Sequence, residues 1–515
     1  MEDGNVTGNE DTEKIQTFLE RVNERQRYLD RHVVKCHQAS AIHFLLDSLT
    51  KYSYGFLADD MGLGKTATAV LILLYLILTQ GIKVVVICPP SVLNVWTATF
   101  KYWVDVDLTN PTKCDTGEKH ARATVTSFVR NGSFLAHTLI MTPQTFLKQS
   151  CILEEIRENL LVIVDEVHEA VRTQQTEAHS ALLRFSPKFY LFLSGTPLVN
   201  QLGDIYSLTC ALSANANNKE NILGGKKNFT KSVSEISSHI DKALNVCTTQ
   251  QDRKKSCNAA SNNLKAIQSA LALIMVRRRF LAIEGSDLPI PKRINIIWSM
   301  TQSQQCLYNV LDQQQGFAAV ATARHITDFG CTHVSDIHSD ENLSSILHNS
   351  PSFQFIEAIL KDTLIMHSKI VIVAERTTLL KWLLTLCSSI HMPANMLHGN
   401  TEIESRQCMV DTFNITTGAF CLLLSKKAGG VGISLTAAST IIIMDIAYNP
   451  SDDDQAVSRI FRIGQNKICR VVKMIGSELD NLNYQVQPYF TNFYLTHMVI
   501  LANKKIASSV SSQKD

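Results

Sequence analysis

The stretch from Leu57 to Thr66, Leu-Ala-Asp-Asp-Met-Gly-Leu-Gly-Lys-Thr, constrains the fold of this chain more than any other feature. The apolar run Tyr54 to Ala58 predicts a strand, and the longer apolar run Ala67 to Leu78 predicts a helix. The glycines between them allow the backbone to curl, so that successive N–H groups point at an anion held at the helix N-terminus. This junction predicts an α/β fold with an anion-binding loop.

The Lys-Thr pair that ends the loop indicates which anion is bound. Lys65 supplies a positive charge suited to the outer phosphates of a nucleoside triphosphate, and the Thr66 hydroxyl is suited to ligating Mg²⁺. The strict motif has Gly at the position of Asp59, so the match is imperfect. We predict that ATP and Mg²⁺ are bound by Asp59, Asp60, Met61, Gly62, Leu63, Gly64, Lys65 and Thr66.

Two other interpretations of the loop are open to the same residues. One is a glycine-rich turn that binds nothing. The other is a dinucleotide-binding loop, because Gly62-x-Gly64-x-x-Ala67 fits that pattern as well. A dinucleotide fold needs an acid at the end of the next strand. The next predicted strand, Lys83 to Cys88, is followed by Pro-Pro-Ser, so the Lys-Thr pair favours a nucleoside triphosphate.

Composition limits the class of protein. The chain has 515 residues, enough for several domains, with 45% hydrophobic and 19% charged residues. Its net charge of +2 gives no overall attraction to nucleic acid, so such binding has to be local. The 13 cysteines are scattered, which favours a reducing compartment over a disulfide framework. The acidic N-terminus and the short apolar runs predict an intracellular protein without a membrane partner.

Strand-like and helix-like segments alternate twice along the chain, which is typical of parallel sheets covered by helices. The strands predicted for the first sheet are Tyr54–Ala58, Lys83–Cys88, Leu139–Thr142, Leu160–Asp165 and Phe189–Leu193. Those predicted for the second are Lys369–Ala374, Asn395–His398, Phe420–Leu424, Thr440–Asp445 and Cys469–Ile475. Ligands of such sheets bind at the carboxyl ends of the strands.

Two acids follow the apolar strand 160–164 at such an end. Asp165 is suited to holding Mg²⁺, and Glu166 to orienting and deprotonating an attacking water. A capped strand end with solvated acids is the alternative for an isolated pair. The phosphate-binding loop predicted in the same sheet favours the catalytic interpretation.

Basic residues elsewhere have less specific patterns. Arg459 and Arg462 are three apart, and on a helix they share a face, so they could reach a phosphate as arginine fingers or simply form surface ion pairs. The triplet Arg277-Arg278-Arg279 could touch phosphates or be a solvated connector. An N-terminal stripe of arginines predicts a solvated helix face. It comprises Arg21, Arg25, Arg27 and Arg31.

Together these motifs resemble the SWI/SNF-type ATPases, which are double-stranded-DNA translocases of helicase superfamily two. The markers, in chain order, are Gln38, the loop 59–66, Pro89-Pro90-Ser91-Val92-Leu93-x-x-Trp96, Asp165-Glu166-Val167-His168, Ser194-Gly195-Thr196-Pro197, Ala428-Gly429-Gly430-Val431-Gly432, Asn449-Pro450-x-x-Asp453-x-Gln455-Ala456 and Arg459-x-x-Arg462-Ile463-Gly464-Gln465. Acid is usual at the position of Asp59 in this family. Tyr448 and Phe461 depart from its pattern, which puts the coupling of DNA contact to hydrolysis in doubt.

The resemblance implies two RecA-like lobes with an ATP site in the cleft between them. It assigns catalysis to Lys65, Asp165, Glu166, Arg459 and Arg462, nucleotide contacts also to Gln38 and Gln465, and the acidic box to residues 165–168. We predict an N-terminal segment 1–30, a first lobe 31–212, a helical insertion and linker 213–345, a second lobe 346–480 and a tail 481–515.

The resemblance also implies the partners and the setting. Double-stranded DNA is the expected track, with nucleosomes or transcription machinery as further candidate partners. Compact viral members are the nearest likeness, which implies residence in the nucleus of an infected host cell and activation of viral transcription. A DNA-dependent ATPase acting on transcription complexes and a non-enzymatic ATP-binding scaffold are the alternatives.

Overall fold

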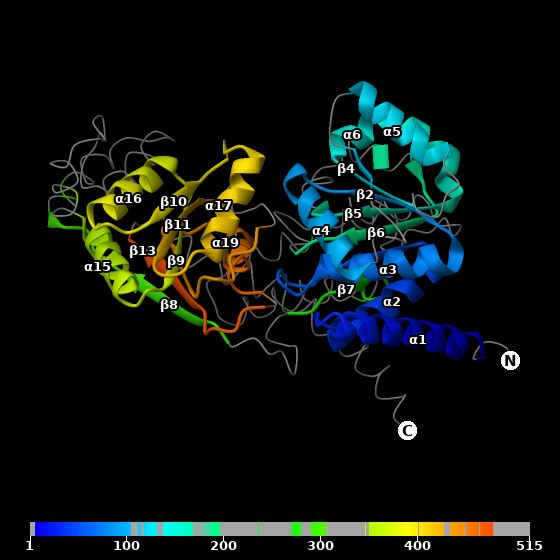
Figure 1. The fold of residues 1–515 in the computed structure, drawn as a ribbon, viewed down its shortest axis with the longest axis horizontal. Coiled ribbons are helices and arrows are strands. Elements are labelled where there is room, and N and C mark those ends of the chain that lie inside the picture. Colours follow the sequence, from blue (N-terminus) through cyan, green and yellow to red (C-terminus); the bar gives the residue numbers. More distant parts are fainter. Residues whose placement is uncertain are drawn as a thin grey trace. The chain divides into compact units, whose positions relative to one another are not determined.

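The computed structural model divides into two compact units, the first reaching from Met1 to Ile283 and the second from Glu284 to Tyr494. Each unit contains a sheet of its own (Figure 1). The described residues are 6–104, 112–114, 118–130, 137–167, 181–182, 185–195, 271–279, 290–302, 350–399, 401–426, 433–447, 450–462 and 464–476, with a few isolated positions. His168, residues 196–200 and 427–432, and the predicted tail lie outside them.

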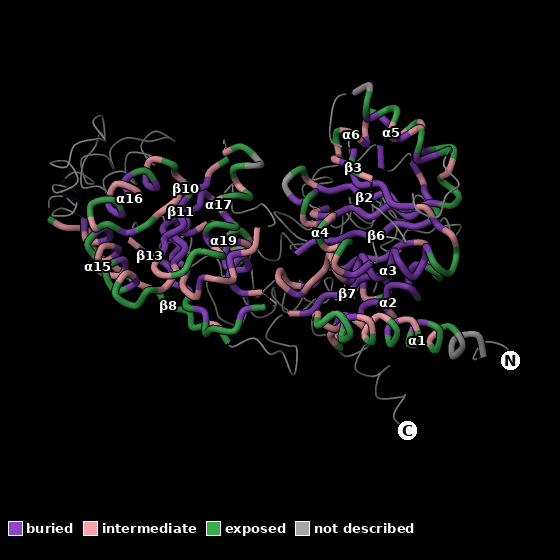
Figure 2. The backbone as a smooth tube through the Cα atoms, in the orientation of Figure 1, coloured by how far each residue is buried: buried purple, intermediate pink, exposed green. Residues whose placement is uncertain are grey.

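The described part of the first unit contains a seven-stranded sheet in the order β3-β4-β2-β5-β6-β1-β7, and every pairing in it is parallel. Its strands are β1 (Tyr54–Leu57), β2 (Lys83–Ile87), β3 (Thr112–Cys114), β4 (Thr138–Met141), β5 (Leu160–Val164), β6 (Phe189–Leu193) and β7 (Met275–Val276). The central strands are buried along their whole length, which explains their continuous apolar sequences (Figure 2).

Helices cover this sheet, and the most apolar of them follows the phosphate-binding loop. The helices are α1 (Val6–Tyr28), α2 (Cys36–Tyr52), α3 (Lys65–Gln80), α4 (Leu93–Trp103), α5 (Glu118–Arg130) and α6 (Pro143–Leu153), with 3₁₀ turns at Pro90–Val92 and Glu154–Asn159. Helix α3 packs against α2 and α4 and is buried from Thr68 to Ile77. It is therefore a core helix, as its length and composition predicted.

Helix α1 lies in the segment predicted to be polar and solvated. Its apolar side chains Ile15 and Leu19 belong to the core of the first unit, and the Phe18 ring meets Tyr75 of α3 edge-on at 5.4 Å between centroids. The guanidiniums of Arg25 and Arg31 donate to the carbonyls of Trp103 (3.4 Å) and Tyr102 (2.7 Å) at the end of α4. These two arginines therefore connect the C-terminal part of α1 and the segment after it to the end of α4. The prediction of a wholly solvated basic face is wrong for them.

The described part of the second unit contains a six-stranded sheet in the order β10-β11-β9-β12-β13-β8, again with parallel pairings throughout. Its strands are β8 (Lys292–Ile297), β9 (Lys369–Ala374), β10 (Ala394–Leu397), β11 (Phe420–Ser425), β12 (Thr440–Ile443) and β13 (Arg470–Ile475). Its helices are α15 (Pro351–Ile365), α16 (Thr377–Ser389), α17 (Ile403–Ile415) and α19 (Pro450–Val457). The predicted fold class, two parallel-sheet α/β lobes, is confirmed.

The interval 213–345, predicted as helical insertion and linker, contains two strands that the sequence did not predict. Strand β7 completes the edge of the first sheet, and β8 completes the edge of the second. The first is too short for any periodicity, and the second, Lys-Arg-Ile-Asn-Ile-Ile, is mostly exposed. The two lobes therefore extend into the interval. Most of its predicted helical content lies outside the described residues.

Candidate nucleotide-binding site

The phosphate-binding loop connects the end of β1 to the start of α3. Gly62 and Gly64 have φ angles of 87° and 81°, in the left-handed region that a side chain disfavours. Gly64 is the N-cap of α3, so the free N–H groups of the first helical turn face the loop. Thr66 lies in that first turn and is half-buried. The structure thus places both predicted ligand-bearing residues at the helix N-terminus.

The Lys65 side chain is folded back under the loop. Its Nζ donates to the carbonyl oxygens of Asp59 (2.9 Å) and Asp60 (3.3 Å). Burial lowers the pKa of Lys65, against the opposing effect of nearby acids, of which Glu166 is the strongest. A Cβ at Gly195, two residues after β6, would overlap Cγ of Met61 and lie 3.3 Å from the Lys65 Nζ, so a side chain there would displace Met61 of the loop.

The acidic pair follows β5, and hydrogen bonds orient the carboxylate of Asp165. Asp165 is buried, and its two carboxylate oxygens accept hydrogen bonds from the Glu166 N–H (2.9 Å) and from Nε1 of Trp96 on α4 (2.7 Å). Burial, together with the charge of Glu166, raises the pKa of Asp165 to about 6, while the Trp96 bond acts in the opposite direction. Each oxygen keeps a second lone pair, so the carboxylate is able to bind Mg²⁺ directly or through water.

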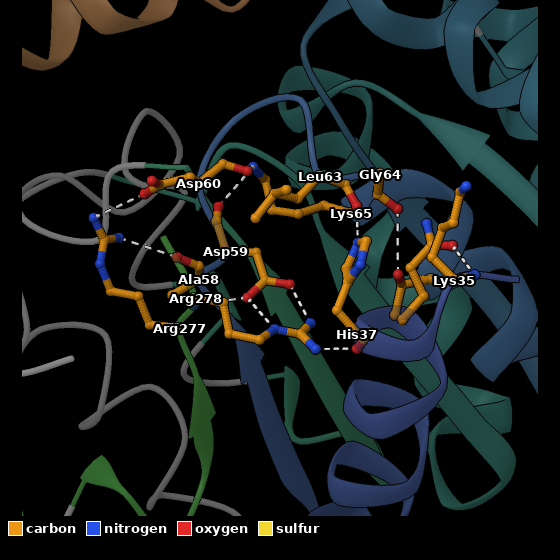
Figure 3. A network of polar contacts seen from close by, with 12 residues as sticks. Lys35, His37, Ala58, Asp59, Asp60, Leu63, Gly64, Lys65, Arg277 and Arg278 are labelled. Atoms are coloured by element: carbon orange, nitrogen blue, oxygen red, sulfur yellow. Dashed lines mark hydrogen bonds and ion pairs between the residues drawn. The ribbon is translucent and has the colours of Figure 1, made fainter. Parts of the chain in front are cut away.

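The Arg277-Arg278-Arg279 triplet has a role that neither of its two interpretations anticipated. Arg277 and Arg278 are buried, and Arg278 forms an ion pair with Asp59 of the loop (Figure 3). Its Nε lies 3.0 Å from Asp59 Oδ1, and its backbone N–H donates to the same oxygen at 2.9 Å. For these two arginines the solvated connector is wrong, because both side chains are buried, and the phosphate contact stays a prediction. The acid in place of glycine at position 59 was the available signal, since a buried acid requires a partner.

The two glutamines predicted to contact nucleotide are engaged within their own lobes. Gln38 is buried in the first turn of α2, and its Oε1 accepts the Lys35 N–H at 3.0 Å, as in a capping box. Gln465 Nε2 donates to the carbonyls of Thr436 (3.1 Å), Ala438 (2.8 Å) and Ile460 (3.0 Å). Its amide therefore links backbone segments of the second lobe, and the nucleotide contacts of both glutamines stay predictions.

Arg459 and Arg462 lie beyond the helix on which we predicted them. Helix α19 ends at Val457, and the chain continues in tight turns, with the Arg459 N–H bonded to the Ala456 carbonyl and the Ile460 N–H to that of Val457. Arg459 is buried. Burial lowers the pKa of Arg462, whose Nη1 lies 3.5 Å from the Ile433 carbonyl. The helical placement is wrong because i to i+3 bonds tighten the chain at this point.

A buried acid anchors α19 in front of these arginines. Asp453 accepts hydrogen bonds from Lys426 at the end of β11 (3.2 Å) and from Lys473 on β13 (2.9 Å). Lysines at the end of β11 and on β13 therefore fix the position of α19, from whose end the turn with Arg459 begins.

Comparison with known proteins agrees with these motifs. A family described as SNF2-related domain matches residues 37–348, which is more than half of the chain. The chain belongs to the SNF2-related family. The helicase conserved C-terminal domain matches residues 353–464, so this SNF2-related protein carries both modules of a helicase-type ATPase.

Curated relatives match along most of the chain. It is 26% identical to Protein CHROMATIN REMODELING 5 of Arabidopsis thaliana over 90% of this chain and 27% of that protein. It is 26% identical to the chromodomain-helicase-DNA-binding protein 1-like of Mus musculus (95% and 52%) and to DNA repair and recombination protein RAD54-like of Danio rerio (86% and 64%). The chain thus spans between about a quarter and two thirds of the length of these relatives.

A solved structure, the Sulfolobus solfataricus SWI2/SNF2 ATPase core in complex with dsDNA, is 20% identical, with a TM-score of 0.40 over 90% of this chain and 92% of that one. Within the residues that the structure describes, no helix is long and apolar enough to cross a membrane, and no group of three or more His, Cys, Asp and Glu residues could hold a metal ion.

Proposed function

We propose that this SNF2-related protein is an ATP-dependent double-stranded-DNA translocase that remodels chromatin or other DNA–protein complexes. The observation that carries the proposal is the site of the first lobe, where Lys65, Asp165 and Glu166 surround a phosphate-binding loop at the N-terminus of α3. A helix N-terminus, an ammonium group and two acids are what a Mg²⁺-bound triphosphate requires.

The donor set fits this ligand. ATP supplies the phosphoanhydride bond, with its Mg²⁺ held by Thr66 and Asp165. Lys65 binds the outer phosphates with the ammonium group that here donates a hydrogen bond to the Asp59 carbonyl of the loop. Glu166 orients the attacking water and accepts its proton at the carboxylate. Arg459 and Arg462 of the second lobe are proposed to stabilise charge in the transition state.

The proposal of duplex DNA as the track is supported by the motifs and by the relatives. The loop 59–66 and the Arg462-Ile463-Gly464-Gln465 segment match translocases rather than strand-separating helicases, and the names of the relatives refer to chromatin remodelling and DNA repair. A uniform phosphate backbone can be followed by contacts that hold and release in turn. We therefore expect strong dependence on salt and little dependence on sequence.

We also propose that the protein acts in the nucleus, because the proposed remodelling activity has chromatin as its substrate. The most specific version of this proposal is that the protein activates viral transcription in the nucleus of an infected cell. The likeness to the global transactivator of insect baculoviruses implies this version. The two alternatives retained are a DNA-dependent ATPase acting on transcription complexes and a non-enzymatic ATP-binding scaffold. The presence of both acids after β5, with the Asp165 carboxylate oriented by two hydrogen bonds, favours an enzyme.

The deciding experiment measures ATP hydrolysis without nucleic acid and with duplex DNA, single-stranded DNA or RNA, using Lys65→Ala as the inactive control. We expect duplex DNA to stimulate strongly. A labelled strand should be displaced from a triplex but not from a tailed duplex. Release of the duplex strand, or stimulation by RNA alone, contradicts the proposal. Sliding of nucleosomes compared with release of a stalled polymerase separates remodelling from action on transcription complexes.

A further inference from the structure

The first half of the phosphate-binding loop is paired like a strand with residues from the far end of the first unit. The N–H groups of Phe56, Ala58 and Asp60 donate in turn to the carbonyls of Ile274, Val276 and Arg278, at 2.8, 2.7 and 2.9 Å. The ladder between β1 and β7 therefore continues past the end of both strands. Hydrogen bonds to residues 276–278 therefore hold residues 58–60 beyond the end of β1, and the glycines with positive φ, Gly62 and Gly64, come after them.

Two buried arginines close this ladder (Figure 3). Arg277 Nη1 donates to the carbonyls of Ala58 (3.0 Å) and Gly195 (3.4 Å), which joins the ends of β1 and β6, and its Nη2 lies 3.6 Å from Asp60 Oδ1. Arg278 bonds Asp59 with its side chain and its backbone N–H together.

Arg278 also reaches the second half of the loop through His37. Its guanidinium donates to the His37 carbonyl, and His37 Nε2 lies 3.1 Å from the carbonyl of Leu63. One side chain therefore contacts Asp59 directly and Leu63 through a single intermediary. Asp59 precedes the glycine turn, and Leu63 lies within it, between Gly62 and Gly64.

We propose that Arg278, with Arg277, is a positioning residue of the ATPase, which holds the phosphate-binding loop in shape from β7 by pairing with Asp59. This inference rests on the proposed function. Asp59 thereby has a role that does not involve contact with nucleotide. The loop depends on a segment 219 positions away in the sequence, shortly before the chain enters the second unit at Glu284.

The energetic reason is that removing one member leaves the other charge buried without its partner. Such a charge draws in water or moves toward solvent, and either response shifts the backbone of the loop. Lys65 bonds the carbonyls of Asp59 and Asp60, so a shift of these residues displaces the ammonium as well. A misplacement of about 1 Å in such a site can cost on the order of 10²-fold in rate.

The test uses the full chain and compares Arg278→Gln, Asp59→Asn and the double variant. Arg279→Gln is the matched control, since it removes the same charge from the next, half-buried residue. The measurements are kcat and KM for ATP, the Kd of a fluorescent ADP analogue and the thermal unfolding midpoint. A merely structural role lowers the folded fraction, and so kcat, while KM and Kd stay at the wild-type values.

We expect each single variant to lower kcat/KM by about 10²-fold, mainly through a higher KM, and to weaken ADP binding. The loss of kcat/KM in the double variant should be no larger than that in the more impaired single variant, because the two residues act as a pair. Arg278→Lys should not restore activity, since an ammonium cannot form the fork that bonds Asp59 and His37.

The inference is overturned if both single variants fold and their KM and Kd change by less than about twofold. It is also overturned if the free-energy losses of the single variants simply add in the double variant. If the single variants do not fold, the double variant decides, because it leaves no unpaired charge. Its failure to fold assigns the pair to folding alone and also overturns the inference. A wild-type protein that neither binds nor hydrolyses ATP contradicts the proposed function instead.

Discussion

Glu166 has a φ angle of 46°, in the left-handed region that few non-glycine residues occupy. Its N–H is bonded to the Asp165 carboxylate, which holds the backbone in this conformation against a cost of about 1–3 kcal/mol. The conformation turns the chain sharply at the end of β5, directly after the proposed metal ligand. Strain that is retained at such a point is consistent with a functional residue.

Glu166→Gln tests the general base. The amide cannot accept the proton of water, so turnover should fall by about 10²-fold or more while ATP binding persists. Steady-state hydrolysis and nucleotide binding measure the two effects. Glu158→Gln, the same change at an exposed acid before the strand, should behave like the wild type. Normal turnover in the Glu166→Gln protein would contradict the assignment.

Trp96→Phe tests the orientation of Asp165. It removes the indole N–H that bonds Oδ2 and keeps most of the buried volume. Loss of a hydrogen bond that orients a metal ligand typically weakens metal binding by about 10- to 100-fold, so the Mg²⁺ concentration needed for half-maximal activity should rise by about 10-fold or more. A magnesium titration of the ATPase measures this. Trp103→Phe, another buried tryptophan of α4, is the control, and equal effects of both would refute the role of Trp96.

His37 makes the first lobe sensitive to acid. Burial lowers its pKa below the usual 6.5, with the Leu63 bond opposing and the charge of Arg278 adding to the effect. Below pH 6.5 the unfolded chain therefore binds the proton more readily than the folded one, and stability is lost as the pH falls. The stability difference between neutral and mildly acidic pH should be smaller in His37→Gln than in the wild type. His32→Gln, at an exposed histidine, should leave this stability difference as in the wild type, and urea unfolding at the two pH values measures it.

At the scale of elements, α1 is part of the first lobe rather than an appendage. Leu19 is 3% exposed and packs into the same core as α2, α3 and α4. Leu19→Ala should destabilise this unit by about 2–5 kcal/mol through lost burial and a cavity. Urea unfolding measures the change. Tyr28→Ala, at a residue of the same helix that is 89% exposed, should change stability little, and a comparable loss there would contradict this account.

At the scale of the whole molecule, the proposed function requires the second lobe to act on ATP held by the first. Arg459→Ala and Arg462→Ala should each lower turnover by about 10³-fold or more with little change in ATP affinity, because a finger acts on transition-state charge. Single-turnover hydrolysis and ADP binding measure the two effects. Arg470→Ala, at an exposed arginine of the same unit, is the control. If both variants hydrolyse ATP normally, the lobes do not act together as proposed.

The sequence alone determined those features that depend on neighbouring residues. Apolar runs located most of the strands, because a strand in the interior of a parallel sheet is buried on both faces whatever its partners are. The phosphate-binding loop and the acids after β5 were predicted for a similar reason. Left-handed glycines, a helix N-terminus and a strand end are local properties of the backbone.

The tertiary structure decided which distant groups complete the site. Arg278 and Asp59 are 219 positions apart, and Trp96 and Asp165 are 69 apart, so no local pattern joins them. The same limit applies to Gln465, whose side chain bonds the Ala438 carbonyl 27 positions away, whereas the Gln38 bond to Lys35 is a local helix cap. A polar residue in a motif shows that it needs a partner, and the path of the chain decides whether that partner is a ligand or the protein itself.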